Sequence, residues 1–196
     1  TSQQMKPWLP GVGDVDIDDG IDRRFTLADW LTSPENSLFA KVEVNRLWRS
    51  VMGKGIVDPA DDFRASNPPS NADLLDALAA DFVKHRFDRR HMLRVILNSQ
   101  TYQRGSKINS QNEGDDRYFS RYTRRLLTAE QLLDAVCDVT GVPESFSGLP
   151  AGTRATQLPS PDFGKAFLKV FGQPERTSVC QCERSVDLNL SQALQI

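Results

Sequence analysis

The stretch SPENSLFAKVEVNRLWRSVMG, residues 33–53, predicts the central helix of this protein. Ser33 is expected to cap the helix, with Pro34 at its first position, and Gly53 follows its end. Side chains recur on one face of this helix at spacings of three and four residues. That face consists of Leu38, Val42, Asn45, Trp48 and Met52, in which the amide of Asn45 interrupts an otherwise apolar stripe.

Further helices are predicted on both sides of this one. TLADWLTS (26–33) indicates a short helix, Ser70 or Asn71 caps a third helix, and Asp88 starts a fourth. The expected inward positions are Leu74, Leu75, Leu78, Phe82 and Val83 in the third helix, and Met92, Leu93, Ile96 and Leu97 in the fourth.

Later in the chain, Thr128 and Gln131 form a capping box for another helix, which Gly141 ends. A helix over residues 161–171 and a last one around Val186 are also predicted. Two long irregular stretches, 55–71 and 143–161, separate these patterns. The fold class expected from the whole pattern is all-α, an irregular bundle with two long ordered loops.

Composition and length suit one globular domain of 196 residues, 39% of them hydrophobic. Residues 1–24 are rich in proline and glycine and carry five aspartates between Asp14 and Asp22, which indicates an extended, solvated acidic lead-in. Residues 25–196 are expected to form a single helical domain. Both ends look cut from something longer, so the chain is expected to be a fragment of a multidomain protein.

The charge balance argues against nucleic acid as a partner. The 24 basic and 26 acidic side chains give a net charge of −2, so no global field recruits a polyanion. A local cluster of Arg117, Arg121, Arg124 and Arg125 lies near two tyrosines, but no basic surplus supports it elsewhere. No apolar run approaches the roughly 20 residues of a membrane helix.

One concentration of polar residues joins the central helix to the loop that follows it. The candidate binding residues are Asn45, Arg46, Trp48, Asp62, Arg64, Asn67 and Tyr102. In one interpretation, Asp62 and Arg64 pin the loop to the helix through Asn45 or Arg46, so that Arg64→Ala destabilises the domain. In the other, a polar pocket lined by Trp48 holds a sugar or a peptide.

The CQCER stretch, residues 180–184, is the clearest chemical candidate. Thiols at i and i+2 face the same side when the backbone is extended, so Cys180 and Cys182 could supply two ligands to a soft metal or form a strained, redox-labile disulfide. Glu183 and Arg184 would complete a redox or metal site. The alternative is structural: two small buried residues beside an ion pair.

The other cysteine and the two histidines carry less information. Cys137 is expected in the core, on the apolar face of its helix. His85 and His91 stand six residues apart across a predicted helix break, which is neither the spacing of a helical zinc pair nor a familiar acid–base arrangement. Both are expected at the surface.

These motifs together resemble the planctomycete-type PSD domain, the domain of unknown function fifteen-fifty-three. The resemblance runs through TLADWL (26–31), NRLW (45–48), GKGIV (53–57), DDFR (61–64), NPPSN (67–71), LNSQTY (97–102), RRL (124–126), AE (129–130) and CQCER (180–184). It covers nearly the whole chain.

The resemblance implies context more than chemistry. It implies a large exported protein, hence an extracytoplasmic location, periplasmic or at the cell surface, in which a cytochrome-c-like or other domain precedes this one. The family supplies no catalytic residues to carry over. No cofactor is expected in this chain, and haem would belong only to an upstream domain, since no haem-attachment motif is present.

The sequence therefore favours a docking or interaction module whose partners are other domains of the same chain, or a carbohydrate or protein ligand. The alternative is a redox or metal-dependent enzyme half-site that uses the cysteine pair and nearby carboxylates. We expect that this chain by itself is not an enzyme.

Overall fold

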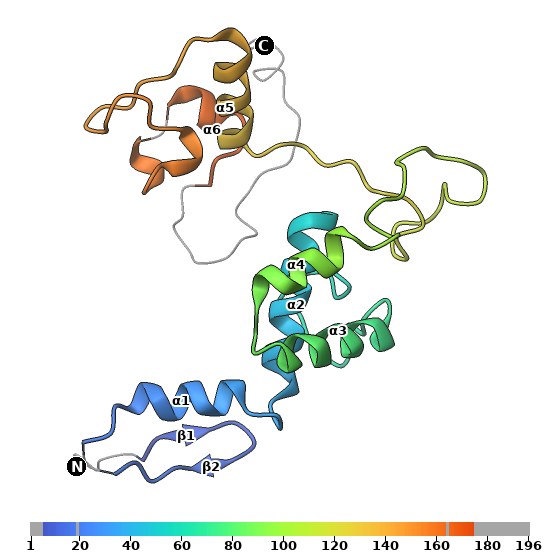
Figure 1. The fold of residues 1–196 in the computed structure, drawn as a ribbon, viewed down its shortest axis with the longest axis vertical. Helices are drawn as coiled ribbons and strands as arrows, with labels where there is room; N and C mark the ends of the chain where they lie inside the picture. The colour runs from blue at the N-terminus through green and yellow to red at the C-terminus, as the bar shows by residue number, and fades with distance from the viewer. Residues whose placement is uncertain (1–5, 19, 164, 175–196) are drawn as a thin grey trace. The chain divides into compact units, whose positions relative to one another are not determined.

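The computed structural model describes residues 6–18, 20–163 and 165–174. The chain is mostly helical and divides into two compact units, residues 1–124 (unit 1) and 125–196 (unit 2) (Figure 1). Each unit has its own hydrophobic core. The expected single domain over residues 25–196 stays a prediction.

Unit 1 opens with a minimal antiparallel sheet and a helix. Strand β1 (Trp8–Leu9) pairs with β2 (Gly13–Asp14) in the register Trp8 to Asp14 and Leu9 to Gly13. Helix α1 (Arg23–Thr32) follows, and the carboxylate of Asp22 caps it by accepting a hydrogen bond from the backbone N–H of Arg24. The lead-in therefore contains a short hairpin, and the first helix begins before the TLADWLTS motif.

Helix α2 (Ser37–Met52) is the axis of unit 1, and Gly53 ends it in the left-handed conformation at a φ of 84°. Its N-cap is Asn36, whose side chain accepts from the N–H of Phe39. The expected cap Ser33 is wrong: Ser33 terminates α1 instead. Glu35 in the expected first turn favoured Ser33 by pattern, but the chain turns once more between the two helices before α2 starts.

Helices α3 (Ala72–Lys84) and α4 (Arg89–Leu97) form the hairpin that packs on α2 (Figure 1). Asn71 caps α3 by accepting from the N–H of Leu74, and Asp88 caps α4 by accepting from the N–H groups of Arg90 and His91. Both predicted caps are confirmed. Three- or four-residue turns between such helices keep them antiparallel neighbours.

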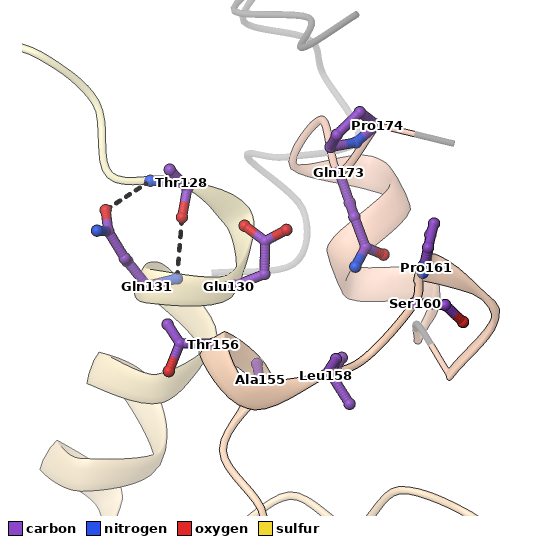
Figure 2. Close-up of a pocket in the computed structure, with 10 residues that line it drawn as sticks. All are labelled: Thr128, Glu130, Gln131, Ala155, Thr156, Leu158, Ser160, Pro161, Gln173 and Pro174. Atoms are coloured by element: carbon purple, nitrogen blue, oxygen red, sulfur yellow. Dashed lines mark hydrogen bonds between the residues drawn. The ribbon is translucent and has the colours of Figure 1, made fainter. Parts of the chain in front are cut away.

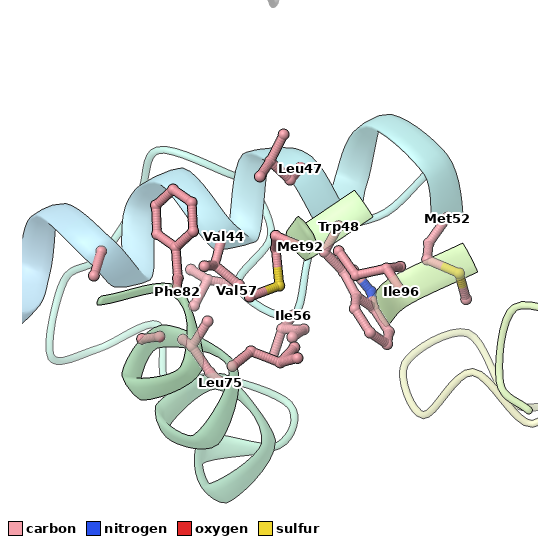
Figure 3. Packing of buried hydrophobic residues seen from close by; sticks show 13 residues of the cluster. Val44, Leu47, Trp48, Met52, Ile56, Val57, Leu75, Phe82, Met92 and Ile96 are labelled. Atoms are coloured by element: carbon pink, nitrogen blue, oxygen red, sulfur yellow. The ribbon is translucent and has the colours of Figure 1, made fainter. Parts of the chain in front are cut away.

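The core of unit 1 forms between α2, α3, α4 and the loop after Gly53 (Figure 3). Its largest fully buried side chains include Val44, Met52, Val57, Leu75, Phe82, Met92 and Ile96. Each contributes about 1.5–3 kcal/mol by leaving water. The predicted stripes are correct at their centres and wrong at their edges: Leu38 is 53% exposed, and Val83 and Leu97 are also exposed.

The rest of unit 1, residues 98–124, is irregular, so neither a helix nor a strand forms over the arginine cluster in that described segment. Asp115 organises it by accepting hydrogen bonds from the backbone N–H groups of Arg117, Tyr118 and Ser120 at 2.7–2.9 Å. A hydrogen bond from the Ser120 side chain, followed by these backbone hydrogen bonds, holds the pKa of Asp115 far below its usual value. The segment returns to the core through Phe119, which packs edge-on against Trp48.

Unit 2 is built on helix α5 (Ala129–Thr140), two 3₁₀ turns, η1 (Ala155–Gln157) and η2 (Pro161–Phe163), and helix α6 (Ala166–Val170). The predicted capping box of Thr128 and Gln131 is confirmed, as is Gly141 at the C-cap. The helix expected over 161–171 is divided into η2 and α6.

The core of unit 2 is small: Ala129, Leu133, Phe146, Ala155 and Leu168 are buried in it. Cys137, half-buried, packs against this cluster, in line with the expected core position.

The helix expected around Val186 lies outside the described residues. Among the helices that the structure describes, none is long and apolar enough to cross a membrane.

Candidate functional site

The polar group predicted between the central helix and its loop exists as a contact, with Asn45 at its centre. Asn45 is completely buried. Its Nδ2 donates to the carbonyl oxygens of Val57 at 2.9 Å and Ala60 at 3.0 Å, and its Oδ1 accepts from the N–H of Val57 at 3.0 Å. The amide therefore joins α2 to residues 57–60 and is occupied by backbone groups.

Of the charged members of this group, Arg46, Asp61 and Arg64 are exposed, and Asp62 is half-buried. Arg46 donates to Asp61 at 2.8 Å, and Arg64 donates to both carboxylate oxygens of Asp62 at 2.6 Å. This pairing lowers the pKa of Asp62 through hydrogen bonds from Arg64. Asp62 contacts Arg64 within the loop, and Asn45 takes its partners from the backbone, so the pinning of the loop comes from Asn45 rather than from the carboxylate.

The remaining predicted binding residues are divided between surface and core. Asn67 donates from Nδ2 to the carbonyl oxygen of Asp62 at 2.9 Å, which closes the loop on itself. Trp48 is 2% exposed and belongs to the core. Tyr102 is half-buried against Tyr122, with ring centroids 5.7 Å apart. Ligand binding by these residues stays a prediction.

The predicted redox or metal residues Cys180, Cys182, Glu183 and Arg184 lie outside the described residues. The alternative function built on them therefore stays a prediction as well.

Among its described residues, 125–163 and 165–174, unit 2 contains two cavities that sequence reasoning did not anticipate. One, of about 300 Å³, lies between the C-terminal half of α5 and the loop 143–154, with Cys137, Asp138 and Arg154 on its wall. The other, of about 260 Å³, is lined by polar groups of α5 and η1 and by Gln173 (Figure 2). The capping box of Thr128 and Gln131 forms part of that second wall. Both volumes are at or below the lower end of the range for small-molecule sites.

Asp134 accepts several hydrogen bonds that link elements of unit 2. It accepts from the N–H of Ala155 at 2.7 Å, from the N–H and hydroxyl of Thr156 at 3.2 and 2.7 Å, and from Arg154 at 3.4 Å. Burial raises the pKa of Asp134, but the hydrogen bonds from Thr156 and Ala155 outweigh it and leave the pKa below its usual value. Asp134 thus anchors η1 to α5.

Sequence reasoning also missed a grouping of Asp81 with the two histidines. Asp81 and His85 are four residues apart at the end of α3, so they share one helix face, and the turn into α4 returns His91 to the same place. The Asp81–His85 spacing was the available signal. The approach of His91 was not in the pattern, because it depends on the geometry of the turn.

The N-terminal part of unit 1 exposes a group of large apolar side chains. We call this group the N-terminal apolar surface: Trp8, Val12, Ile21, Phe25, Leu27 and Leu38. Trp8 is 62% exposed and Phe25 67% exposed. Exposed apolar residues are normal singly. We take these six side chains, which fall within about thirty residues of chain, as a candidate interaction surface.

Comparison with known proteins identifies the family of this chain but no individual curated protein or solved structure. Residues 23–158 match the sequence model of the family PSD1, described as "Protein of unknown function (DUF1553)". No curated protein and no solved structure matches the chain.

Proposed function

Because the chain belongs to the PSD1 (DUF1553) family of proteins of unknown function, we propose its role from its own surface: it is an interaction module that docks to another protein domain through the N-terminal apolar surface. The observation that carries this proposal is helix α1. All ten of its residues are described, and none of them is buried.

Helix α1 lacks the packing that ordinarily stabilises a helix of its length. An isolated helix shorter than about 12–15 residues is marginal in water, and helices in proteins owe their stability to a buried apolar face. In α1, Trp30 and Leu31 are half-buried, whereas Phe25 and Leu27 face solvent. A partner that covers Phe25 and Leu27 would supply the missing contacts.

The hairpin before α1 has the same need. Each strand is two residues long, and Trp8 of one strand pairs with Asp14 of the other. A two-stranded hairpin alone is marginally stable at best. Trp8 and Val12 are both more than 60% exposed. Covering them would remove apolar surface from water at about 25 cal/mol per Å².

Charge indicates the chemistry of the partner. Residues 6–38 carry seven acidic and three basic side chains, a net charge of −4 in a chain whose total is −2. Asp16 is 85% exposed in its pair with Lys6. A complementary surface would have an apolar centre rimmed by lysine and arginine, which speeds encounter and disfavours wrong partners.

We place the partner within the same polypeptide, as the family resemblance implies: the domain expected to precede this one, cytochrome-c-like or otherwise, in an extracytoplasmic protein. Docking within one polypeptide benefits from a high effective concentration, so an interface of modest area suffices.

Amide hydrogen exchange over residues 23–32 tests this proposal. It is measured in the chain alone and in a longer polypeptide in which the preceding domain remains joined to the chain. We expect fast exchange in the chain alone and at least about tenfold slower exchange in the longer polypeptide. Phe25→Asp should abolish the difference, because an aspartate in the first turn does not oppose helix formation but removes the apolar contact.

Val142→Asp is the matched control. Val142 is 68% exposed and belongs to unit 2, outside the N-terminal apolar surface, so its substitution should leave the protection of α1 unchanged. Exchange in α1 that is equally fast with and without the preceding domain would contradict the proposal, as would strong protection of α1 in the chain alone.

A further inference from the structure

The junction of α3 and α4 brings two imidazoles onto one carboxylate. His91 Nε2 lies 2.7 Å from Asp81 Oδ2, and His85 Nδ1 lies 3.2 Å from Asp81 Oδ1. The two rings are stacked, with centroids 3.7 Å apart and planes 20° from parallel. One ligand atom of each residue lies within 4.8 Å of the others.

The turn between the helices creates this arrangement. Arg86 and Phe87 both adopt left-handed backbone conformations, with φ of 54° and 59°, which is uncommon for residues other than glycine. Phe87 secures the turn by packing edge-on against Phe82, with ring centroids 5.4 Å apart, and by donating its N–H to the Phe82 carbonyl. The histidines are therefore positioned by the core rather than by chance at the surface.

His85 Nδ1 also lies 2.9 Å from the carbonyl oxygen of Asp81, so hydrogen bonds link both rings to this residue. A divalent cation would replace these hydrogen bonds, because it uses the lone pairs of neutral rings and balances the charge of the carboxylate. Lys84, whose charge acts on Asp81, is exposed at the helix end and is free to turn toward solvent.

We propose that Asp81, His85 and His91 form a binding site for a divalent transition-metal ion, with Zn²⁺ as the best-suited ion. Two nitrogens and one carboxylate oxygen are the donor set that zinc takes with three protein ligands, and imidazole discriminates against Mg²⁺ and Ca²⁺. In a tetrahedral site with bonds of about 2.0–2.1 Å, ligand atoms are roughly 3.3 Å apart, so the three side chains, now within 4.8 Å, would close on the ion and the stacked rings would turn until their lone pairs converge.

Three protein ligands leave a coordination position for water or for a ligand from outside. The ligand side chains are 29–40% exposed, so this position faces solvent. The carboxylate of Asp88 does not join them, because it caps α4. The site is thus open on one side, the arrangement that zinc proteins use when the ion does more than hold the fold together.

Among the residues that the structure describes, Asp81, His85 and His91 form a group of histidine and carboxylate side chains close enough together to share one ion. The metal site shares no residue with the N-terminal apolar surface, so failure of the docking proposal would not contradict the metal site, and the reverse also holds.

Metal content after dialysis against Zn²⁺, together with calorimetric titration, tests the site. The measurement uses the full chain with Cys137, Cys180 and Cys182 changed to serine, so that thiols cannot hold the ion. We expect one zinc per chain with a dissociation constant below about 10 μM. His85→Gln and His91→Gln should each weaken binding by at least about 100-fold. Co²⁺ should give the visible absorption bands of a low-coordinate nitrogen and oxygen site.

Asp61→Asn is the matched control, since Asp61 is an exposed carboxylate paired with Arg46 outside the site, and zinc binding should be unchanged in it. His85 is itself exposed, so His85→Gln reports on binding without threatening the fold. Zinc retained in both histidine variants would overturn the proposal. Zinc lost with the cysteines, or no saturable binding at all, would also overturn it and leave a hydrogen-bonded group at the surface.

Discussion

The side-chain amide of Asn45 pairs with the backbone of Val57 in both directions: Nδ2 donates to the Val57 carbonyl at 2.9 Å, and Oδ1 accepts from its N–H at 3.0 Å. The side chain thereby makes the two backbone hydrogen bonds that a neighbouring strand would make in a sheet. The loop after α2, which would otherwise bury unpaired backbone groups, is attached to the helix by one residue.

Asn45→Ala should destabilise unit 1 by about 2–5 kcal/mol, because it leaves buried groups of Val57 and Ala60 without partners. Asn45→Asp retains the size but loses both donors, and should cost at least as much. Urea unfolding followed by tryptophan fluorescence measures this in unit 1 alone, since Trp8, Trp30 and Trp48 all lie there. A midpoint equal to wild type in Asn45→Ala would refute the anchoring role.

Arg64→Ala should leave the same unfolding midpoint unchanged within error. The sequence favoured a loss of stability. In the structure, however, Arg64 is 75% exposed and pairs with Asp62 two residues away in the same loop, and an ion pair with such an exposed partner contributes little. A clear loss of stability in Arg64→Ala would mean that the loop is pinned through this pair after all.

Gly55→Ala should destabilise unit 1 by several kcal/mol, a cost similar to that of overpacking a hydrophobic core. A Cβ at Gly55 would overlap the Val57 carbonyl oxygen and press on the Asn45 amide at 3.0–3.1 Å. Gly105→Ala is the control, because a Cβ there meets nothing within 4 Å. The double variant Asn45→Ala/Gly55→Ala should cost less than the sum of the two, since both disrupt one contact. Strict additivity would argue against that shared contact.

Asp134→Asn should increase amide exchange in α5 roughly tenfold at pH 7, the equivalent of a hydrogen bond worth about 1–1.5 kcal/mol. Asp138→Asn, which changes an exposed carboxylate on the same Arg154, should change it far less.

The effect of Asp134 should also depend on pH in a defined direction. The pKa of Asp134 is lowered in the folded protein, so its stabilisation is complete above the unfolded value of about 3.9 and is lost as pH falls through the lower folded value. The difference between wild type and Asp134→Asn should therefore shrink below about pH 4. A difference that stays constant into acid would show that the charge of Asp134 is not what stabilises η1.

Much of the helical architecture was determined by the sequence alone, because helix ends are short-range events. Asn71, Asp88 and the Thr128–Gln131 box each act through a hydrogen bond that spans at most three residues. Gly53 and Gly141 take left-handed conformations that their neighbours in sequence already predict. Such signals need no knowledge of the rest of the chain.

The tertiary structure decided what depends on distant partners. Asn45 could be recognised as a polar residue on an apolar face, but its partners at 57 and 60 were set by the path of the loop. Leu38 shares the helical period yet stays exposed, because periodicity gives the direction of a face and not how far a neighbouring helix extends along it. His91 contacts Asp81, ten residues earlier, because of the turn between α3 and α4. Packing of Phe87 holds the left-handed residues of that turn. Long-range packing of that kind gives no periodic pattern in the sequence.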